Sequence, residues 1–370
     1  MQYRQFGKIG RISALGFGCM RLPLDAEGNV DESLAIPMLR RGYELGINYF
    51  DTAYYYCNEQ SQYVVGKAIK PFRNHIMLST KLPLGDTADR SFFRKTLEEQ
   101  LRRLDTDYLD VYHFHALNWK KFNDVVLAND MLTDARKAID EGLIRHISFS
   151  FHDKPEYISA IIERGEIFSS VLCQYNLLDR ANEEQIAKVH ERGMGVVIMG
   201  PVGGGRLGGA SMLSEKITKK FTATPELALR FVLGNENVSC ALSGMSTMEQ
   251  LEQNAAVADD EVPMTPETFR QIHDALHEIE HFNDLYCTGC EYCLPCPRGV
   301  EIPKIFKAYN MHNVYGLTEF AKNSYAKISE KAGLGSAATA CVGCRSCVKK
   351  CPQNLDIPVN LKKIDEFFAK

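Results

Sequence analysis

Cys287-Thr-Gly-Cys290-Glu-Tyr-Cys293-Leu-Pro-Cys296-Pro297 is followed later in the chain by a second run of the same kind, Cys341-Val-Gly-Cys344-Arg-Ser-Cys347-Val-Lys-Lys-Cys351-Pro352. These two runs hold eight of the twelve cysteines in a chain of 370 residues. Three thiolates spaced by two residues can converge on one face of an iron–sulfur cube, and a fourth cysteine stands before a proline. Four-cysteine zinc sites use related spacings and remain an alternative. Two [4Fe-4S] clusters are the first hypothesis.

Composition limits the classes of function that the chain can have. It is 45% hydrophobic, which allows a large core, and its net charge of -4 comes from charges of both signs. This balance gives no electrostatic reason to expect nucleic acid or an anionic membrane surface as a partner. The start lacks an apolar signal core, and no apolar run reaches about 18 residues. Cysteines grouped at metal spacing favour a reducing compartment. We therefore expect a cytoplasmic protein that binds neither nucleic acid nor membrane.

The first two thirds of the chain alternates short apolar runs with amphipathic helical stretches, from Ser13 to about Ala258. Eight apolar runs are strand candidates: Ala14 to Gly18, Asn48 to Thr52, Ile76 to Leu82, Tyr108 to His115, Ile144 to Phe151, Ser170 to Tyr175, Val196 to Pro201 and Val238 to Gly244. Helices are expected between them, for example at Asp31 to Leu45, Ser91 to Leu104, Asn182 to Arg192 and Pro225 to Leu233. Eight βα units favour an α/β fold of the (β/α)8 TIM-barrel type over an open sheet. The segment from Tyr3 to Ile12 predicts a hairpin that plugs the bottom of the barrel.

Reactive side chains in such a barrel belong at the C-terminal ends of the strands. Asp51, Lys81 and His115 end the second, third and fourth predicted strands, and Tyr56 lies a turn beyond Asp51. Here the sequence resembles the aldo/keto reductases, from about residue 3 to residue 258. Three segments are similar to that family's catalytic tetrad segments, in the same order: Gly46-Ile-Asn-Tyr-Phe-Asp51-Thr-Ala-Tyr-Tyr-Tyr56, Ser79-Thr-Lys81-Leu and Tyr108-Leu-Asp-Val-Tyr-His-Phe-His115. Each motif alone is weakly specific, whereas the ordered set is strongly specific.

The four residue types suit carbonyl reduction. Tyrosine titrates near 10, so donating its proton near neutral pH benefits from an ammonium that stabilises the phenolate left behind. Lys81 would supply that charge, and Asp51 would hold Lys81 charged. His115 would orient the carbonyl or relay the proton. Each residue taken alone has a competing structural interpretation. The tyrosine would be an aromatic residue of the rim, and the lysine or the histidine would be a solvated residue at a strand end.

The resemblance also implies NAD(P)H as cofactor and nine residues that bind it: Ser150, Gln174, Gly203, Gly204, Gly205, Arg206, Gly244, Ser246 and Asn254. Ser150 and Gln174 match the positions that hold the nicotinamide carboxamide in the family. The glycine cluster before Arg206 lets backbone approach phosphates, although a mobile lid is its alternative reading. Gly244 to Asn254 is similar to the adenosine-phosphate segment, where helix N-terminal amides favour phosphate.

Three departures from the family pattern weaken the nicotinamide inference. Phe151 stands where an asparagine is common, and Met199 stands where an aromatic residue is expected to stack on the nicotinamide. No arginine occurs between Gly244 and Asn254, so a clamp for a 2′-phosphate is missing from that run. These differences leave room for a flavin in the same cleft.

The cysteine runs form an internal repeat, because Ile302-Pro303 and Ile357-Pro358 stand at the same distance after each fourth cysteine. Helical segments follow both, and the run between them lacks strand alternation, so the region resembles the α-helical type of ferredoxin domain. That resemblance implies two crossed ligand sets: Cys287, Cys290 and Cys293 with Cys351, and Cys341, Cys344 and Cys347 with Cys296. The first run is one residue shorter than usual before Cys296. The predicted domains are a barrel (1–261), a connecting helix (262–285) and a small, mainly α-helical 4Fe-4S domain (286–370).

The leading hypothesis is an oxidoreductase that reduces a small carbonyl substrate, with Tyr56 as proton donor and a link to iron–sulfur electron transfer. A hydride carries two electrons and a cluster carries one, so coupling needs a carrier that handles both. One alternative is therefore a flavin-mediated reductase fed by a ferredoxin or another electron donor. Another is a redox-sensing iron–sulfur protein without turnover. Clusters with a purely structural role are a further alternative.

Overall fold

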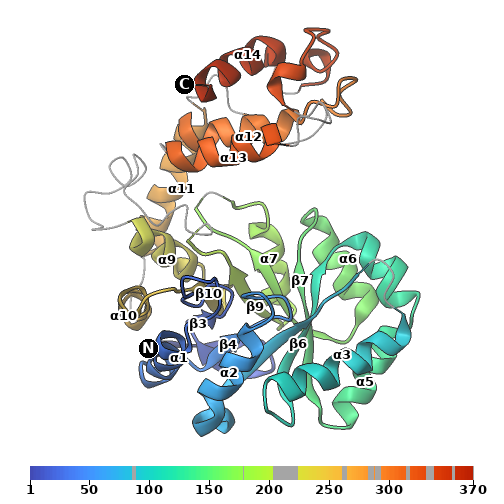
Figure 1. The fold of residues 1–370 in the computed structure, drawn as a ribbon, viewed down its shortest axis with the longest axis vertical. Coiled ribbons are helices and arrows are strands. Elements are labelled where there is room, and N and C mark those ends of the chain that lie inside the picture. The colour runs from blue at the N-terminus through green and yellow to red at the C-terminus, as the bar shows by residue number, and fades with distance from the viewer. Residues whose placement is uncertain are drawn as a thin grey trace. The chain divides into compact units, whose positions relative to one another are not determined.

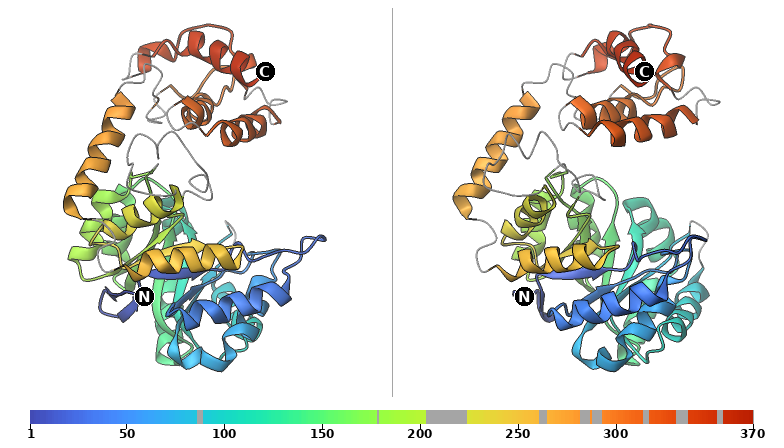
Figure 2. Two further views of the ribbon diagram at one scale, coloured as in Figure 1. Left: turned by 90° about the vertical axis from the view of Figure 1, so that its left-hand side faces the viewer. Right: turned by 60° about the vertical axis from the view of Figure 1, so that its left-hand side comes forward.

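The computed structural model describes residues 1–85, 89–177, 179–202, 224–260, 265–281, 287, 293–313, 317–330, 337–351 and 355–369. Its contacts divide the chain into two compact units. One comprises Met1–Gly205 with Pro225–Thr265, and the other contains Pro266–Lys370. Figures 1 and 2 show both units as ribbons, and each is described by itself below.

The first unit is a closed barrel of parallel strands with helices around it, which confirms the predicted (β/α)8 fold (Figure 1). Its strands are β3 (Leu15–Gly18), β4 (Tyr49–Asp51), β5 (Met77–Leu82), β6 (Leu109–Leu117), β7 (Ile144–Phe151), β8 (Phe168–Gln174), β9 (Gly195–Met199) and β10 (Cys240–Gly244). They follow one another around the barrel in chain order, and β10 closes it against β3. Parallel strands are covered on both faces, which explains why they read as continuous apolar runs in the sequence.

An antiparallel hairpin of β1 (Tyr3–Phe6) and β2 (Gly10–Ser13) precedes the barrel, as expected. Phe6 and Ile12 are fully buried in one cluster with interior residues of the barrel such as Val197. Gly7 in the turn has φ +53°, and a Cβ there would lie 2.5 Å from the backbone nitrogen of Gly195. Only glycine allows this close approach, so the hairpin covers the N-terminal ends of the strands.

Helices connect the strands of the first unit, namely α1 (Glu32–Glu44), α2 (Ser61–Ile69), α3 (Arg90–Arg103), α4 (Trp119–Lys121), α5 (Met131–Asp140), α6 (Glu156–Gly165), α7 (Glu183–Glu191), α9 (Thr224–Gly234) and α10 (Met248–Asp259). A 3₁₀ segment, η1 (Lys70–His75), follows α2, and a π-helical turn, η2 (Phe122–Leu127), follows α4. Side chains at N-caps start several of them, since Asp31, Asp89 and Thr247 each accept a hydrogen bond from a backbone N–H of the first turn. Such caps satisfy amide groups that a helix start leaves without partners.

The regular secondary structure of the second unit is entirely helical within the residues that the structure describes. It contains α11 (Pro266–His281), α12 (Ile302–Asn313), α13 (Thr318–Glu330) and α14 (Ile357–Phe368), with short 3₁₀ turns η5 (Ala338–Ala340) and η6 (Val348–Lys350). Ile305, Phe306, Leu361 and Ile364 are almost completely buried at its centre. The two Ile-Pro pairs of the repeat begin α12 and α14, because proline fits the first turn of a helix. The prediction of a mainly α-helical domain is confirmed.

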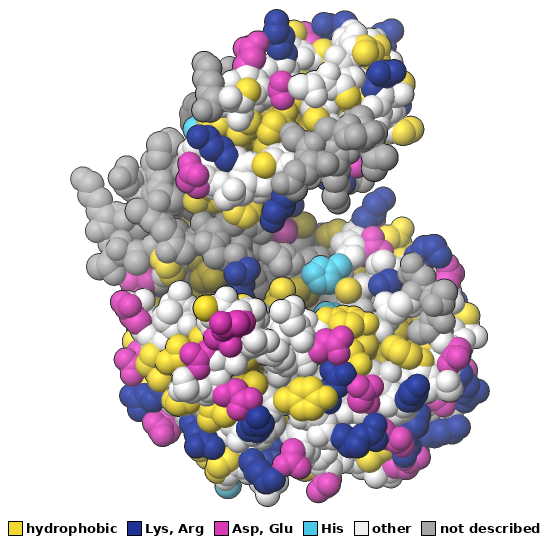
Figure 3. Space-filling view, viewed as in Figure 1, with side chains coloured by type: hydrophobic (Ala, Val, Ile, Leu, Met, Phe, Trp, Pro, Cys, Tyr) yellow, Lys and Arg dark blue, Asp and Glu magenta, His cyan; other side chains and the backbone are white. Residues whose placement is uncertain are grey.

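The surface is consistent with the mixed charge of the sequence. On the face of the barrel shown in Figure 3, Lys and Arg side chains alternate with Asp and Glu side chains. Across the described ranges, the structure contains no helix with the length and hydropathy needed to cross a lipid bilayer.

Candidate active site and candidate cluster site

The C-terminal ends of three neighbouring strands bring the predicted tetrad together. In the parallel register, Asp51 of β4 lies opposite Ser79 of β5, and Lys81 of β5 lies opposite His113 of β6. The carboxyl ends of parallel strands share one rim of a barrel, which places these side chains at its mouth. Residues that are about 30 positions apart in the chain thus become neighbours.

A buried ion pair between Lys81 and Asp51 forms the base of this site. Both side chains are 1% exposed, and the Lys81 ammonium donates to Asp51 Oδ1 and, over 2.8 Å, to the carbonyl oxygen of Thr52. Asp51 Oδ2 accepts a second hydrogen bond, of 2.6 Å, from Ser79 Oγ. Burial lowers the pKa of Lys81, but Asp51 and Tyr56 more than offset it, so its pKa is raised. Lys81 is therefore an ammonium at neutral pH.

Tyr56 lies directly beside this ammonium. Lys81 Nζ is 4.8 Å from the centre of the Tyr56 ring, and the His115 ring packs edge-on at 6.2 Å. Burial raises the pKa of Tyr56, while Lys81 lowers it; the effect of burial is larger, so the pKa lies above 10. The charge of Lys81 alone would lower the pKa of Tyr56, but in the folded protein burial outweighs this effect. The phenol keeps its proton at neutral pH and has one to donate.

The chain turns sharply after Tyr56 in an unusual backbone conformation. Cys57, Asn58 and Glu59 all have left-handed φ values, of 52°, 52° and 66°. Each such residue costs about 1–2 kcal/mol without glycine. Three in succession fix the direction in which the chain leaves Tyr56 before α2 begins at Ser61. Strain of this kind is concentrated at functional sites.

His115 is held by an irregularity in β6. The register shifts between Phe114 and Leu117, and Ala116 has φ +50° with its N–H donating to Ser150 Oγ over 2.8 Å. Bulges of this type redirect a side chain at the end of a strand. Burial, and then the positive charge of Lys81, lower the pKa of His115 to about 3. The imidazole is therefore neutral at pH 7 and can act as a hydrogen-bond donor to a carbonyl oxygen.

His113 belongs to the same cluster, although the sequence analysis did not select it. Its Nε2 lies 3.4 Å from the Tyr49 hydroxyl and 3.9 Å from Asp51 Oδ2, and its side chain is fully buried. Its Nδ1 has no hydrogen-bond partner in the described part of the chain, although the Phe149 backbone lies close. Alternate residues of a strand face the same side. The position of His113 two residues before His115 therefore predicts that both side chains face the same cluster.

We expect His113 to make folding stability depend on pH. Burial, and then the charge of Lys81, hold its pKa well below the ordinary value of 6.5. Below about pH 6.5 the unfolded chain binds a proton that the folded chain does not, so stability falls as pH falls, by at most about 1.4 kcal/mol per unit. His113→Gln should flatten this dependence between pH 7 and 5 in urea unfolding.

The matched control for this measurement is His190→Gln, because His190 is exposed at the end of α7. It should leave the slope of the free energy of unfolding against pH unchanged. An identical slope for His113→Gln and the unchanged protein would show that His113 takes up a proton in the folded state as readily as in the unfolded state.

Two of the expected cofactor-binding residues lie on adjacent strands at the barrel mouth. Ser150 of β7 is buried, and Gln174 ends β8 opposite Met199. A Cβ on Gly200, which has φ +64°, would lie 3.0 Å from the Gln174 amide oxygen, so glycine lets that amide pack closely against the backbone. An amide and a hydroxyl can hydrogen-bond the polar edge of a nicotinamide ring. Gly203, Gly204, Gly205 and Arg206 lie outside the described residues.

The other expected contacts gather where β10 meets β3. Gly244 ends β10, and Ser246 Oγ donates to the carbonyl oxygen of Arg21 over 2.8 Å. Asn254 Nδ2 donates to Ser243 Oγ over 3.2 Å. The Arg21 side chain lies across Gly244, since a Cβ there would be 3.3 Å from Arg21 Cδ. An arginine from the loop after the first strand of the barrel thus reaches the predicted phosphate segment, where the local sequence contains none.

Arg21 could have been found from the fold rather than from its own motif. Closure of the barrel pairs β10 with β3, and Gly244 lies opposite Gly18. Arg21 follows Gly18 by three residues and is therefore carried to the end of the last strand. Arg21 and Gly244 are more than 200 residues apart in the chain, so local sequence around Gly244 does not indicate this arginine.

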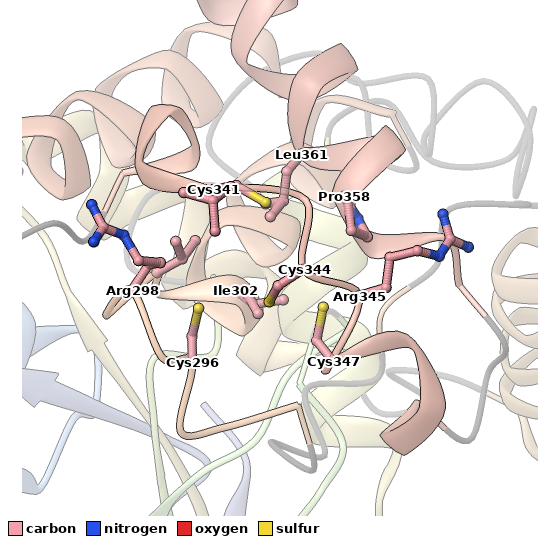
Figure 4. A pocket seen from close by; sticks show the side chains of 11 residues that line it. Cys296, Arg298, Ile302, Cys341, Cys344, Arg345, Cys347, Pro358 and Leu361 are labelled. Atoms are coloured by element: carbon pink, nitrogen blue, oxygen red, sulfur yellow. The ribbon is translucent and has the colours of Figure 1, made fainter.

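Four predicted cluster ligands surround one pocket in the second unit. The pocket has about 280 Å³ of empty space, part of it open to solvent, and Cys296, Cys341, Cys344 and Cys347 line it (Figure 4). The fourth cysteine of the first run thus joins the first three of the second run. Apolar side chains such as Ile302 and Leu361 complete the wall.

This donor set fits an iron–sulfur cube. Four cysteine thiols line the pocket, which is the number and type of protein ligand that a [4Fe-4S] cluster takes. Burial raises the pKa of Cys347, and the negative charges of Cys341 and Cys296 add to this effect. A cube of iron would relieve that repulsion by binding the thiolates.

The ligands of the other predicted set are only partly visible. Cys287, Cys293 and Cys351 all pack against the helical core of the second unit. The backbone carbonyl of Cys287 accepts a hydrogen bond of 3.2 Å from Asn310 Nδ2. Cys290 lies outside the described residues, so this set stays a prediction.

Comparisons with known proteins agree with both units. The model of the aldo/keto reductase family matches residues 14–277, and that of a 4Fe-4S dicluster domain matches residues 286–363. An uncharacterised oxidoreductase of Bacillus subtilis, YqkF, is 28% identical over 67% of this chain and 88% of its own. L-galactose dehydrogenase of Arabidopsis thaliana is 26% identical over 76% of this chain and 96% of its own.

Solved structures show the same fold. The aldo-keto reductase AKR11C1 of Bacillus halodurans in its holo form has 30% identity and a TM-score of 0.64, over 74% of this chain and 96% of that one. A reductase of Klebsiella pneumoniae, solved with NADP and acetate, has 23% identity and a TM-score of 0.61 over 74% and 94% of the two chains. The chain is therefore an oxidoreductase of the aldo/keto reductase family that carries a 4Fe-4S dicluster domain.

Proposed function

We propose that this protein reduces a small carbonyl compound with a nicotinamide dinucleotide, using Tyr56 as proton donor and a pair of [4Fe-4S] clusters for electron transfer. The observation that carries the proposal is the Lys81 ammonium, buried between Asp51 and the ring of Tyr56 at the mouth of the barrel. Burying an ammonium is costly unless it is paired and hydrogen-bonded. Stabilising a phenolate gives the arrangement a catalytic purpose.

Each residue has a distinct part in the proposed reaction. A nicotinamide, when bound at the barrel mouth, would supply the hydride for the carbonyl carbon. Tyr56 transfers its proton to the carbonyl oxygen, and Lys81 stabilises the resulting phenolate. Asp51 keeps Lys81 charged and in place. His115, neutral because its pKa is about 3, donates a hydrogen bond that orients the carbonyl.

The dinucleotide would extend along the rim of the barrel. We assign the carboxamide to Ser150 and Gln174, whose amide is held against Gly200. We assign the phosphates to the segment beginning at Gly244 and to Arg21. A guanidinium recognises phosphate through two parallel hydrogen bonds, which makes Arg21 suited to this position.

Arg21→Gln is expected to weaken NADPH binding about 10- to 150-fold, because a charged hydrogen bond contributes roughly 1.5–3 kcal/mol. The dissociation constant can be measured by quenching of protein fluorescence without any substrate. Arg192→Gln is the matched control. Arg192 lies between the end of α7 and the start of β9, at the end of the strand away from the barrel mouth, and it pairs there with Glu163. Equal dissociation constants for the two variants would show that Arg21 does not bind the phosphates.

The clusters would carry single electrons, with a ferredoxin or another one-electron donor as the proposed partner. Anaerobic purification, an absorption spectrum and an iron count test this part; fewer than about four irons per chain would contradict two clusters. The reductase part is tested by oxidation of NADPH with a panel of aldehydes and ketones. Mass spectrometry of the denatured supernatant identifies the organic cofactor, and FMN or FAD there would replace the nicotinamide mechanism with a flavin-mediated one.

A further inference from the structure

Charge is distributed very unevenly between the two parts of the chain. Residues 286–370 contain twelve Lys and Arg but only seven Asp and Glu, a net charge of +5, whereas the whole chain has a net charge of -4. Residues 1–285 therefore have a net charge of -9. The field of such a molecule attracts an acidic partner to the cysteine domain and repels it from the rest.

The positive charge includes the rim of the cysteine pocket. Arg298 and Arg345 both line the pocket, and their side chains lie on opposite sides of it (Figure 4). Lys349 and Lys350 are exposed in η6, two and three residues after the pocket-lining Cys347. Within the described residues, Arg298, Lys349 and Lys350 have no ion-pair partner, while Arg345 pairs with Asp356 over 3.0 Å. Most of this charge is available to another molecule.

The centre of the same surface is apolar and close to the ligands. Residues 342–346 are all exposed, and this segment contains the ligand cysteine Cys344. Val342 lines the pocket and is 62% exposed, one of the most exposed large apolar side chains in the described residues. A cluster held here would therefore lie near solvent, beneath an apolar contact and between cations.

We propose that this surface, the cluster face, is the docking site of an acidic protein that carries one electron. It is formed by Arg298, Val342, Cys344, Arg345, Lys349 and Lys350. Electron-transfer complexes are small and short-lived, and opposite charges around an apolar centre guide their encounter. The proposal rests on the proposed cluster bound by Cys296, Cys341, Cys344 and Cys347. In the transfer, the reduced carrier loses one electron and the cluster gains it, with no bond or proton exchanged.

A matched pair of variants tests the cluster face. Lys349→Glu with Lys350→Glu reverses two charges on it, and Lys322→Glu with Lys327→Glu makes the same change in net charge at two exposed positions of α13, which contributes no residue to the pocket lining. The probe is an acidic plant-type [2Fe-2S] ferredoxin, oxidised, titrated by calorimetry into anaerobically purified full-length protein. The first variant should raise the dissociation constant at least about tenfold at low salt, and the second should change it less than about twofold.

Two further readings separate the outcomes. Binding to the unchanged protein should weaken as salt rises, and basic cytochrome c should not compete for the site. Equal effects of the two variants, or tighter binding to anionic lipid vesicles than to ferredoxin, would overturn the cluster face as a carrier site while the clusters stand. If the unchanged protein contained no iron or were not reduced by dithionite, the cluster assignment would be wrong, and the proposed docking site would be wrong with it.

Discussion

Replacing Tyr56 by Phe is expected to lower kcat for carbonyl reduction by about 10²- to 10⁴-fold, the usual contribution of a general acid. The substitution removes one oxygen atom and keeps the ring that packs against His115 and the Lys81 ammonium. The ion pair between Lys81 and Asp51 should therefore remain, and the dissociation constant of NADPH should stay within about twofold. Single-turnover oxidation of NADPH measures the chemical step directly.

Tyr55→Phe is the matched control. Tyr55 is the preceding residue in the chain, but its side chain is 61% exposed and its ring packs on Tyr54 rather than on the ion pair. Its rate should equal that of the unchanged protein. Undiminished turnover in Tyr56→Phe would mean that another group, such as His115 or water, delivers the proton, and the role assigned to Tyr56 would be wrong.

Cys341→Ala and Cys351→Ala are expected to remove different clusters, although the two residues belong to one run. Cys341 lines the pocket with Cys296, whereas Cys351 is absent from that lining. Each variant should retain about four of about eight irons, and the double variant should retain almost none. Cys296→Ala with Cys341→Ala should lose no more iron than either change alone, because both remove the same cluster.

Cys173→Ala controls for general damage, since Cys173 is buried in β8 and lies outside both runs. It should retain all the iron. Iron counts and absorption spectra of the anaerobically purified variants are sufficient to compare these outcomes. If Cys341→Ala and Cys351→Ala together lost only one cluster, each run would bind its own cluster, and the crossed ligation would be incorrect.

The sequence was most informative where a pattern repeats or where chemistry requires a fixed spacing. The alternation of apolar runs and amphipathic stretches predicted eight βα units, and the barrel confirms them. N-cap residues such as Asp31 marked helix starts within a residue or two. Both depend on contacts between residues close in the chain, which local sequence records directly.

The candidate site was predicted only in part, because its remaining members come from distant segments. Placing His113 in the site requires knowing which residues of β6 face the same side. Its distances to Tyr49 and Asp51 also depend on the register of three strands. Arg21 needed closure of the barrel between β3 and β10. Arg21 stands in no motif, and the motif that contains His113 indicates only His115, so neither residue was selected from local sequence.

Sequence by itself determined the types of residue and their spacing: eight cysteines in two runs, and Asp51, Lys81 and His115 at successive strand ends with Tyr56 a turn beyond Asp51. The resemblance to ferredoxin domains implied the crossed grouping of the cysteines, whereas tertiary structure alone decided which ionisation states the tetrad adopts. Burial raises the pKa of Tyr56 despite Lys81 and lowers that of His115 to about 3. Desolvation and ion pairing act between atoms that folding brings together, so the spacing of residues along the chain does not encode them.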